Sequence, residues 1–256
     1  MNAHSPRNEE LVETCSIELA SAHRSSAAQA KPAVFKEISR RDALQVQARV
    51  LSLLGETSNV SKVGINADGD GIWAPIPSVH CGTSGHAFKL PRSGFIGIEV
   101  EIAARLNQDI TPAIAAGGAE AVLAAVECFH IGVELVATRL EDRDAAGPLA
   151  QLADGINTFG YVHSEIPFPR RNDLAGAMVE VFINDKIIAR EPGASAFGSI
   201  LNPIIACGRI EERPFDGLKA GMLVTTGALS GLVPIQGPAR FRAGLAGFDL
   251  VEFELE

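Results

Sequence analysis

Several features that mark common protein classes are scarce or missing in this sequence of 256 residues. It has four cysteines and six histidines, but no C-x-x-C pair and no H-x-x-x-H or H-x-H spacing. Zinc sites and disulfide frameworks usually depend on such spacings, so the sequence argues against both. No run of about eighteen apolar residues occurs, which argues against a membrane-spanning helix and a membrane partner.

Positive charge is also in short supply. The 22 Lys and Arg residues are outnumbered by 31 Asp and Glu residues, which gives a formal net charge of −9. Beyond adjacent arginine pairs, no basic cluster is present, and a phosphate backbone requires a basic face, so we predict no nucleic-acid partner. Residues 1–10 are polar and lack the apolar core of a signal peptide, so we expect a cytoplasmic protein with reduced thiols.

The apolar residues that are present, 46% of the chain, are enough to form a full core. Their spacing predicts an amphipathic helix over 8–23, and Ser39 begins a second helix that Gly55 ends. From Lys62 onward, short β-branched runs alternate with Gly and Pro, with one helix near 118–125. We therefore predict an α+β fold with a helical N-terminal segment at 1–61 and a β-rich catalytic domain at 62–256.

Later segments predict further elements of this domain. Residues 179–188 are typical of a hairpin that turns at Asn184 and Asp185, since both residue types tolerate a positive φ. The Leu201-Asn202-Pro203 segment opens a short helix. Residues 222–227 predict a strand that stops at Gly227, and two final strands are expected at 239–243 and 248–253.

Two glutamates lie two residues apart within the segment Gly97-Ile98-Glu99-Val100-Glu101-Ile102-Ala103. In a strand, residues i and i+2 point to the same face, so the two carboxylates project together while apolar neighbours fill the other face. Like charges placed together favour a cation, and Mg²⁺, Mn²⁺ or Ca²⁺ prefer such oxygen ligands. The alternative is a half-exposed strand with an acidic solvent face.

A third glutamate and one lysine are further candidates. Glu134 interrupts an apolar run that otherwise resembles a buried strand, so its carboxylate needs a partner, either Arg139 in a salt bridge or a metal ion. Glu127 competes as a ligand but lies at the end of a predicted helix, where solvent is expected. Lys62 begins an apolar segment and is by itself compatible with an ordinary surface lysine.

Taken together and in order along the chain, these motifs resemble the fumarylacetoacetate hydrolase superfamily, in its branch of 2-hydroxypentadienoate-type hydratases and 4-oxalocrotonate-type decarboxylases. The segments that carry the resemblance are Asp42-Ala43-Leu44-Gln45-Val46-Gln47, with Leu44 in place of Tyr, Lys62-Val63-Gly64, Ile98-Glu99-Val100-Glu101-Ile102-Ala103, Glu134 with Thr138-Arg139, Asp154 with Asn157, Leu201-Asn202-Pro203, and Thr225-Thr226-Gly227-Ala228.

The resemblance implies a mixed β-roll or sandwich that assembles into a homo-oligomer. It also implies that Glu99, Glu101 and Glu134 hold one Mg²⁺ or Mn²⁺ ion, that Lys62 is catalytic with them, and that Lys62, Asn157 and Thr226 bind a small 2-oxo or 2-hydroxydienoate substrate. The implied activity is that of a lyase, a 2-keto-4-pentenoate hydratase in aromatic compound catabolism.

Departures from the family pattern leave other reactions open. The segment Ala67–Ile76 is shorter than the corresponding family segment and lacks its P-D-Y-G element, and Gly97-Ile98 replaces the P-R pair before the two glutamates. Because these positions would contact the far end of the substrate, the alternatives are a decarboxylase, a C–C hydrolase or a tautomerase on the same metal site, or a non-catalytic relative.

Overall fold

A computed structural model of the chain describes residues 6–169, 176–210 and 216–256. One set of strands is β1 (Val60–Ile65), β2 (Gly71–Ile76), β3 (Cys81–Thr83), β5 (Phe95–Leu106), β6 (Val126–Ala137), β7 (Thr158–His163) and β10 (Leu223–Pro234). A second set is β4 (His86–Phe88), β8 (Met178–Ile183), β9 (Lys186–Pro192), β11 (Ala239–Leu245) and β12 (Val251–Leu255). The helices are α1 (Pro6–Ser25), α2 (Arg40–Leu54), α3 (Pro112–Ala116), α4 (Gly118–Ala124), α5 (Arg143–Ala153) and α6 (Asn202–Gly208), with short 3-10 turns at η1 (Pro32–Phe35), η2 (Ser78–His80) and η3 (Gly155–Asn157).

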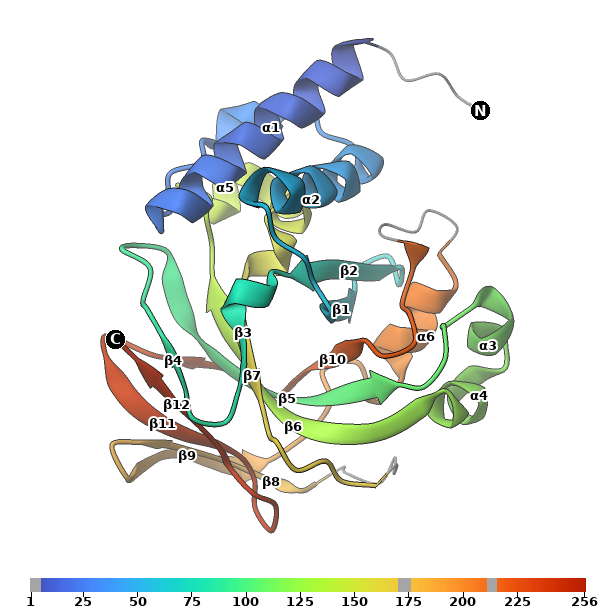
Figure 1. Cartoon of the computed structure of the whole chain (residues 1–256), viewed down its shortest axis with the longest axis vertical. Coiled ribbons are helices and arrows are strands. Elements are labelled where there is room, and N and C mark those ends of the chain that lie inside the picture. Colours follow the sequence, from blue (N-terminus) through green and yellow to red (C-terminus); the bar gives the residue numbers. More distant parts are fainter. Residues whose placement is uncertain (1–5, 170–175, 211–215) are drawn as a thin grey trace.

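The strands form two mixed sheets that pack against each other. The seven-stranded sheet has the order β2-β1-β10-β5-β6-β7-β3, and the five-stranded sheet has the order β4-β12-β11-β8-β9 (Figure 1). Alternate residues of β5, among them Ile98, Val100 and Ile102, are fully buried in the core that these sheets share with Phe241 and Phe253. The predicted α+β fold with curled mixed sheets is confirmed.

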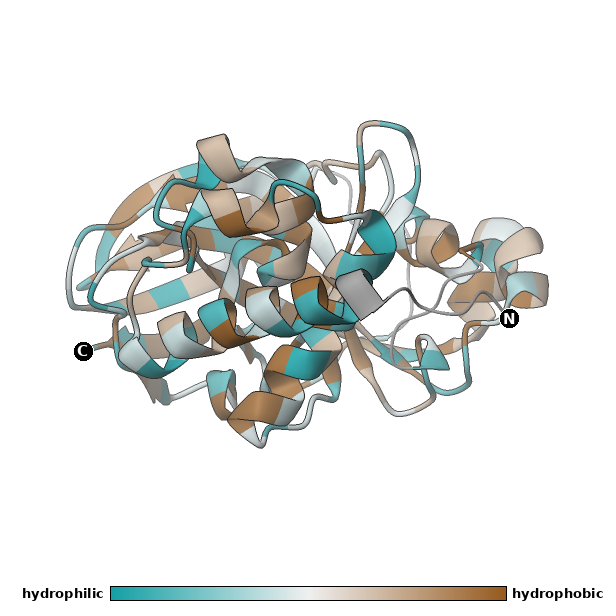
Figure 2. Ribbon diagram, turned by 90° about the horizontal axis from the view of Figure 1, so that it is seen from above, coloured by the Kyte–Doolittle hydropathy of each residue, from teal (hydrophilic) through white to brown (hydrophobic). Residues whose placement is uncertain are grey.

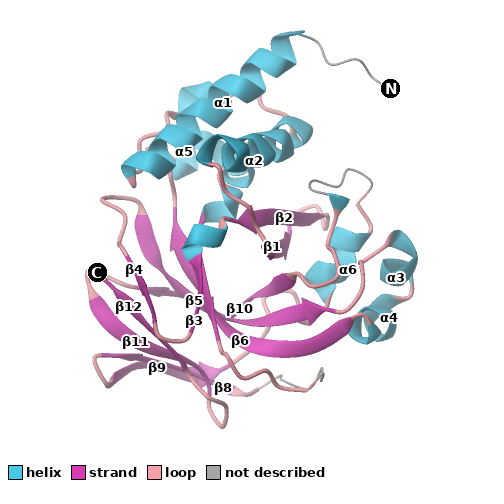
Figure 3. Cartoon of the chain, in the orientation of Figure 1, coloured by secondary structure: helices cyan, strands magenta, loops and turns pink. Residues whose placement is uncertain are grey.

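The helices α1, α2 and α5 gather on one side of the sheets (Figure 3). Ser39 caps α2 in a reciprocal pair with Asp42, and Gly55 ends the helix with φ 69°, so this predicted helix is confirmed at both ends. Seen from above, hydrophilic and hydrophobic residues alternate along the helices (Figure 2). Their apolar sides meet in a second core that includes Leu19, Val46 and Leu152. Within the described ranges, no helix combines the length and the apolar character needed to cross a bilayer.

The other face of β5 lies inside the curl of the seven-stranded sheet. The curl brings β2 next to β7 and η3, although these elements lie far apart in the sheet order or the sequence. Ala103 packs there with Tyr161 and Leu223 in a third, smaller core. Because side chains alternate along a strand, Glu99 and Glu101 share this inner face with Ala103. The fold thus buries Glu101 fully and Glu99 in part.

Most of the later elements follow their predictions, with two exceptions. The β8–β9 hairpin turns at Asn184 and Asp185, both with positive φ, and α4 and α6 lie where helices were predicted. The prediction that the strand stops at Gly227 is wrong, since β10 continues to Pro234. Gly227, with φ 88°, instead marks an irregularity in the pairing of β10 with β5. Helix α5 was not predicted. The division at residues 61 and 62 stays a prediction.

Candidate metal and substrate site

Three carboxylates meet on the inner face of the curled sheet. Glu99 of β5 lies directly opposite Glu134 of β6 in the antiparallel ladder, and Glu101 lies opposite Gly132. One carboxylate oxygen from each of Glu99, Glu101 and Glu134 lies within 4.8 Å of the others. Glu101 and Glu134 are fully buried, whereas Glu99 is partly exposed. The acidic solvent face considered for this strand is therefore not what the fold produces.

Lys62 reaches the same cluster from β1. Its Nζ donates to Glu134 Oε1 at 2.6 Å and to the Ile156 carbonyl at 3.2 Å. The side chain is 12% exposed, so Lys62 is not an ordinary surface lysine. The predicted salt bridge between Glu134 and Arg139 is wrong, because Arg139 pairs with Asp154 and Glu134 pairs with Lys62.

The electrostatics of the cluster show that the chain supplies more negative than positive charge. Burial raises the pKa of Glu101 well above its usual range, and the Glu134 carboxylate adds to the rise. Burial also raises the pKa of Glu99. Burial acts to lower the pKa of Lys62, but the attraction of Glu134, Glu99 and Glu101 outweighs it and the net shift is upward. Lys62 therefore stays charged, but one lysine does not balance three carboxylates, so a second cation would stabilise their charged form.

Unpartnered carboxylate oxygens show where such a cation would bind. Both carboxylate oxygens of Glu101 and Oε2 of Glu134 are buried without a well-formed hydrogen bond. Leaving a buried carboxylate unpaired is costly, and the large majority of buried polar groups in proteins are satisfied. Clustered carboxylate oxygens are the ligands that hard divalent cations such as Mg²⁺ and Mn²⁺ take. The residues present thus fit one divalent ion.

Three residues that the sequence reasoning missed also face the cluster. Thr158 donates its hydroxyl to Glu134 Oε1 at 2.8 Å. The Thr225 hydroxyl lies beside Glu101 and favours its charged form. Tyr161 is fully buried with an unpartnered hydroxyl that occupies the space over Gly132, where a Cβ would overlap it. The period of two in a strand could have identified Thr225, since it places Thr225 and Thr226 on opposite faces.

Two of the three predicted substrate-binding residues, Thr226 and Asn157, do not contact the carboxylates through the hydrogen bonds that they make. The Thr226 hydroxyl donates to the Ile102 carbonyl at 2.8 Å, so Thr225 rather than Thr226 is directed at Glu101. Asn157 lies next to Ile156 in η3, donates to Gln151 Oε1 at 3.2 Å, and keeps a buried Oδ1 without a partner. Glu127 is exposed and is not part of the carboxylate group.

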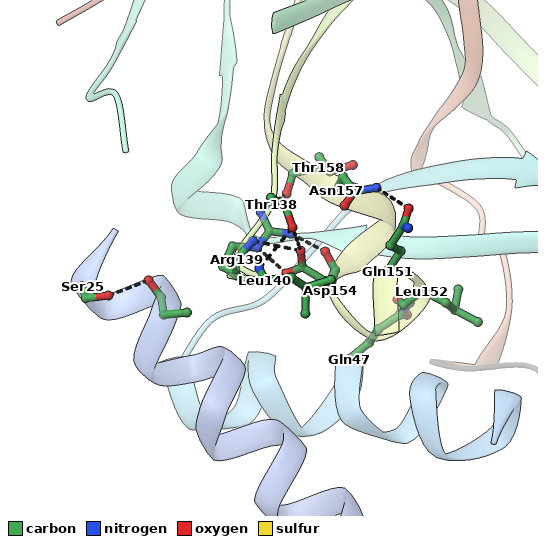
Figure 4. Close-up of polar contacts among 11 residues, drawn as sticks. Ser25, Gln47, Thr138, Arg139, Leu140, Gln151, Leu152, Asp154, Asn157 and Thr158 are labelled. Atoms are coloured by element: carbon green, nitrogen blue, oxygen red, sulfur yellow. Dashed lines mark hydrogen bonds and ion pairs between the residues drawn. The ribbon is translucent and has the colours of Figure 1, made fainter. Parts of the chain in front are cut away.

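A second buried charge cluster borders the site. Arg139, just beyond the end of β6, and Asp154, at the end of α5, form an ion pair at 2.5 Å (Figure 4). Thr138 and the backbone N–H of Arg139 donate to the second carboxylate oxygen of Asp154. In contrast to Glu101, both oxygens of this carboxylate are therefore satisfied.

Comparison with known proteins identifies the fold. No protein-family model matches the sequence. The structure of 4-oxalocrotonate decarboxylase from Pseudomonas putida G7, complexed with magnesium and adipate, matches with a TM-score of 0.83 and 18% identity over 100% of both chains. Fumarylpyruvate hydrolase from Pseudomonas aeruginosa, in complex with Mn²⁺ and pyruvate, matches with a TM-score of 0.53 and 15% identity over 77% of this chain and 88% of the other.

A third match is 2-hydroxyhepta-2,4-diene-1,7-dioate isomerase from Mycobacterium marinum, with a TM-score of 0.55 and 18% identity over 77% of this chain and 73% of the other. These proteins are enzymes with the fold of the fumarylacetoacetate hydrolase superfamily. This chain has that fold, as its motifs predict.

Proposed function

We propose that the protein is a divalent-metal-dependent enzyme that acts on a 2-oxo acid in its 2-hydroxy-2,4-dienoate form, and that hydration of the diene is its reaction. The observation that carries this proposal is the buried cluster of Glu99, Glu101 and Glu134 beside a charged Lys62. The unpartnered carboxylate oxygens support a cation, and the structural neighbours complexed with magnesium and with Mn²⁺ favour Mg²⁺ or Mn²⁺.

The chemistry follows from the charge balance of the site. When bound, a divalent cation neutralises the 1-carboxylate and 2-oxygen of such a substrate and favours its enolic form. Glu99, Glu101 and Glu134 would hold the cation. Lys62 has three N–H donors, of which Glu134 and the Ile156 carbonyl take two, so one remains to donate to the substrate.

The inner face of the sheet supplies the other groups. Thr225 places a hydroxyl beside Glu101, and Asn157 keeps a buried amide oxygen without a partner; both would orient the substrate. Glu101 and Glu134 are fully buried, which strengthens their electrostatic contacts. The proposal therefore moves the substrate contact predicted for Thr226 to its neighbour Thr225.

Decarboxylation is the second candidate reaction. It is favoured by the match with 4-oxalocrotonate decarboxylase, which spans both chains completely, whereas the hydrolase and the isomerase match only part of this chain. Loss of CO₂ leaves an electron pair that the same site would stabilise, and a proton must then reach the substrate carbon. Hydration and decarboxylation thus share the site and differ in the bond that is made or broken.

Two parallel assays test the proposal. The loss of ultraviolet absorbance of 2-hydroxypenta-2,4-dienoate reports hydration, and CO₂ release from 4-oxalocrotonate reports decarboxylation. The wild type is assayed with and without Mg²⁺, beside Glu101→Gln and the exposed control Glu127→Gln. We expect Mg²⁺-dependent hydration in the wild type and the control, and a loss of at least about 100-fold in Glu101→Gln.

Each of the other outcomes would favour a different reaction or role for the site. Metal-dependent CO₂ release without hydration would replace the hydratase by a decarboxylase. Metal binding without turnover of these substrates would favour a C–C hydrolase, a tautomerase or a non-catalytic relative. Equal activity in Glu101→Gln and the wild type would contradict the proposed site.

A further inference from the structure

The turn that precedes β7 has an unusual backbone. Gly155, Ile156 and Asn157 all have positive φ, of 67°, 57° and 59°. Glycine adopts this conformation freely and asparagine tolerates it, but a β-branched residue such as Ile156 is a genuine outlier there. Such strain persists only where the surrounding structure holds it in place.

This turn directs two groups at the carboxylate site. The Ile156 carbonyl accepts a hydrogen bond from Lys62 Nζ at 3.2 Å, and the Thr158 hydroxyl donates to Glu134 Oε1 at 2.8 Å. Lys62 and Glu134 also pair with each other at 2.6 Å. A relaxed backbone at Ile156 would rotate its carbonyl away from Lys62, so the strained conformation and the geometry of the site are linked.

The guanidinium of Arg139 holds both ends of the turn. Its Nε donates to Asp154 Oδ1 at 2.5 Å and its Nη2 donates to the Asp154 carbonyl, on the N-terminal side. Its Nη1 donates to the Thr158 carbonyl at 2.6 Å, on the C-terminal side. Arg139 is 5% exposed and Asp154 is 2% exposed. Figure 4 shows Arg139 with Asp154 and Thr158 around it.

Asp154 is itself fixed from both sides. Its Oδ2 accepts from the Thr138 hydroxyl at 3.0 Å and from the Arg139 backbone N–H at 2.9 Å. Gly155 suits the turn through its φ of 67° rather than through space, because a Cβ there would lie at an ordinary contact distance of 3.7 Å from Arg139 Nη2. A planar guanidinium with several donors in fixed directions suits this arrangement, and a lysine would make fewer of the same contacts.

We propose that Arg139 and Asp154 are positioning residues for the carboxylate site: their ion pair clamps residues 154 and 158 and so holds Ile156 in the left-handed conformation that sets its carbonyl against Lys62 and the Thr158 hydroxyl against Glu134. The inference deepens the proposed function, on which it rests for the working roles of Lys62 and Glu134. It differs from a purely stabilising role because it requires coupling between Arg139 and the strain at Ile156.

Four proteins test this coupling: the wild type, Arg139→Lys, Ile156→Gly, and the double variant. Glycine takes a positive φ without strain, so the turn needs less help from the clamp once Ile156 is replaced. We expect Arg139→Lys to lower kcat by about 10-fold to 100-fold with a smaller change in KM, as removal of a supporting contact does. Adding Ile156→Gly should recover at least half of that loss on a logarithmic scale.

A matched glycine control distinguishes relief of the backbone strain at Ile156 from a general increase in flexibility caused by adding a glycine. Asn184 also has a positive φ, of 47°, but lies in the β8–β9 turn. Asn184→Gly should leave the Arg139→Lys defect unchanged. If both glycine variants rescue equally, or if Ile156→Gly rescues nothing, the positioning role is contradicted. Should Arg139→Lys fail to fold, Asp154→Asn replaces it, since the amide preserves the shape and weakens the clamp.

A readout without metal or substrate keeps this proposal separate from the proposed function. Urea unfolding of the same four proteins in a chelator should show that Arg139→Lys costs more stability in the Ile156→Gly background than in the wild type, because only the strained Ile156 turn recovers free energy by relaxing once the clamp is weakened. Additive effects on unfolding would overturn the inference even in an active enzyme. If the wild type neither binds Mg²⁺ nor turns over substrate, the proposed function fails, and this cycle still decides whether the clamp holds the strained turn.

Discussion

The turn at residues 154–158 lies between two buried clusters of charge, the Arg139–Asp154 pair and the carboxylate cluster of Glu99, Glu101 and Glu134. Only the first cluster has all its carboxylate oxygens paired within the chain. Asp154 has both carboxylate oxygens paired, by the Arg139 guanidinium, the Thr138 hydroxyl and the backbone N–H of Arg139. Glu101, equally buried, has neither oxygen paired. Since an unpaired buried charge is expensive, the fold itself explains the first cluster, whereas the second fits the divalent cation that we propose it holds.

The largest expected effect is on the completed cluster. Arg139→Met removes one partner of the buried pair and leaves Asp154 uncompensated, so the free energy of unfolding should fall by about 3–5 kcal/mol. Urea unfolding measures it. Arg143→Met, which breaks the exposed pair of Arg143 with Asp144, is the control and should cost less than about 1 kcal/mol. Equal losses in the two variants would remove the distinction between a buried and a surface pair.

The incomplete cluster should respond to metal. At a free Mg²⁺ concentration 100 times the Kd, the wild type should gain about 2.7 kcal/mol of unfolding free energy, because the ion binds only the folded protein. Glu101→Gln, whose affinity should be at least about 100-fold lower, should gain no more than about 0.4 kcal/mol, and Glu127→Gln should gain as much as the wild type. Thermal or urea unfolding with and without Mg²⁺ reports the gain. A similar gain in Glu101→Gln would point to a different binding site.

The surroundings of the completed cluster predict a pH effect. Burial lowers the pKa of His80 to about 4, with Arg139 acting in the same direction and Glu56 opposing. Burial, Arg139 and His80 also lower the pKa of His23, whose ring stacks on that of His80. Below about pH 6.5, His80 and His23 bind protons in the unfolded chain but stay neutral in the folded chain until the pH is lower. The stability that His80 contributes is therefore fully present above pH 6.5 and is lost as the pH falls toward 4, by about 2–3 kcal/mol.

The comparison of the wild type with His80→Gln isolates this effect from other titrating groups. Urea unfolding at pH 7.5, 6 and 5 should show a steeper loss of stability in the wild type than in the variant. Parallel pH profiles for the two proteins would show that His80 titrates normally in the folded state.

The smallest expected effect has the opposite sign to the first. In metal-free protein, Glu101→Gln replaces a buried carboxyl whose charged form is disfavoured by burial and by Glu134, so the free energy of unfolding should rise at alkaline pH. Glu127→Gln should change little, because its carboxylate is exposed. If Glu101→Gln destabilises the metal-free protein instead, the carboxylate already has a stabilising partner within the chain.

Much of the fold was predictable where local chemistry decides it. The capping pair of Ser39 and Asp42 and the turn at Asn184 and Asp185 are short-range signals, and the elements they bound were confirmed. Helix α5 was missed because it contains Gly147 and Pro148, which weaken a helical pattern, and because it packs against α2 and η1. Gly227 was misassigned because a glycine that ends a strand and one that marks an irregularity look the same in sequence.

The candidate site was likewise predictable only where a local pattern decides it. The strand period identified Glu99 and Glu101 as a pair, but the partner of Glu134 depends on the curl that brings β1 to β6, which no local pattern encodes. The Arg139–Asp154 clamp and the contacts of Thr158 and Tyr161 likewise join segments that meet only in the folded chain. The homo-oligomeric state and the cytoplasmic location stay predictions.

Calorimetric titration of Mg²⁺ and Mn²⁺ into chelator-treated protein tests the central claim, that Glu99, Glu101 and Glu134 hold one divalent cation. We expect one ion to bind per chain in the wild type and in Glu127→Gln, and the affinity to fall by at least about 100-fold in Glu101→Gln. Absence of binding in the wild type, or equal binding in Glu101→Gln, would contradict it.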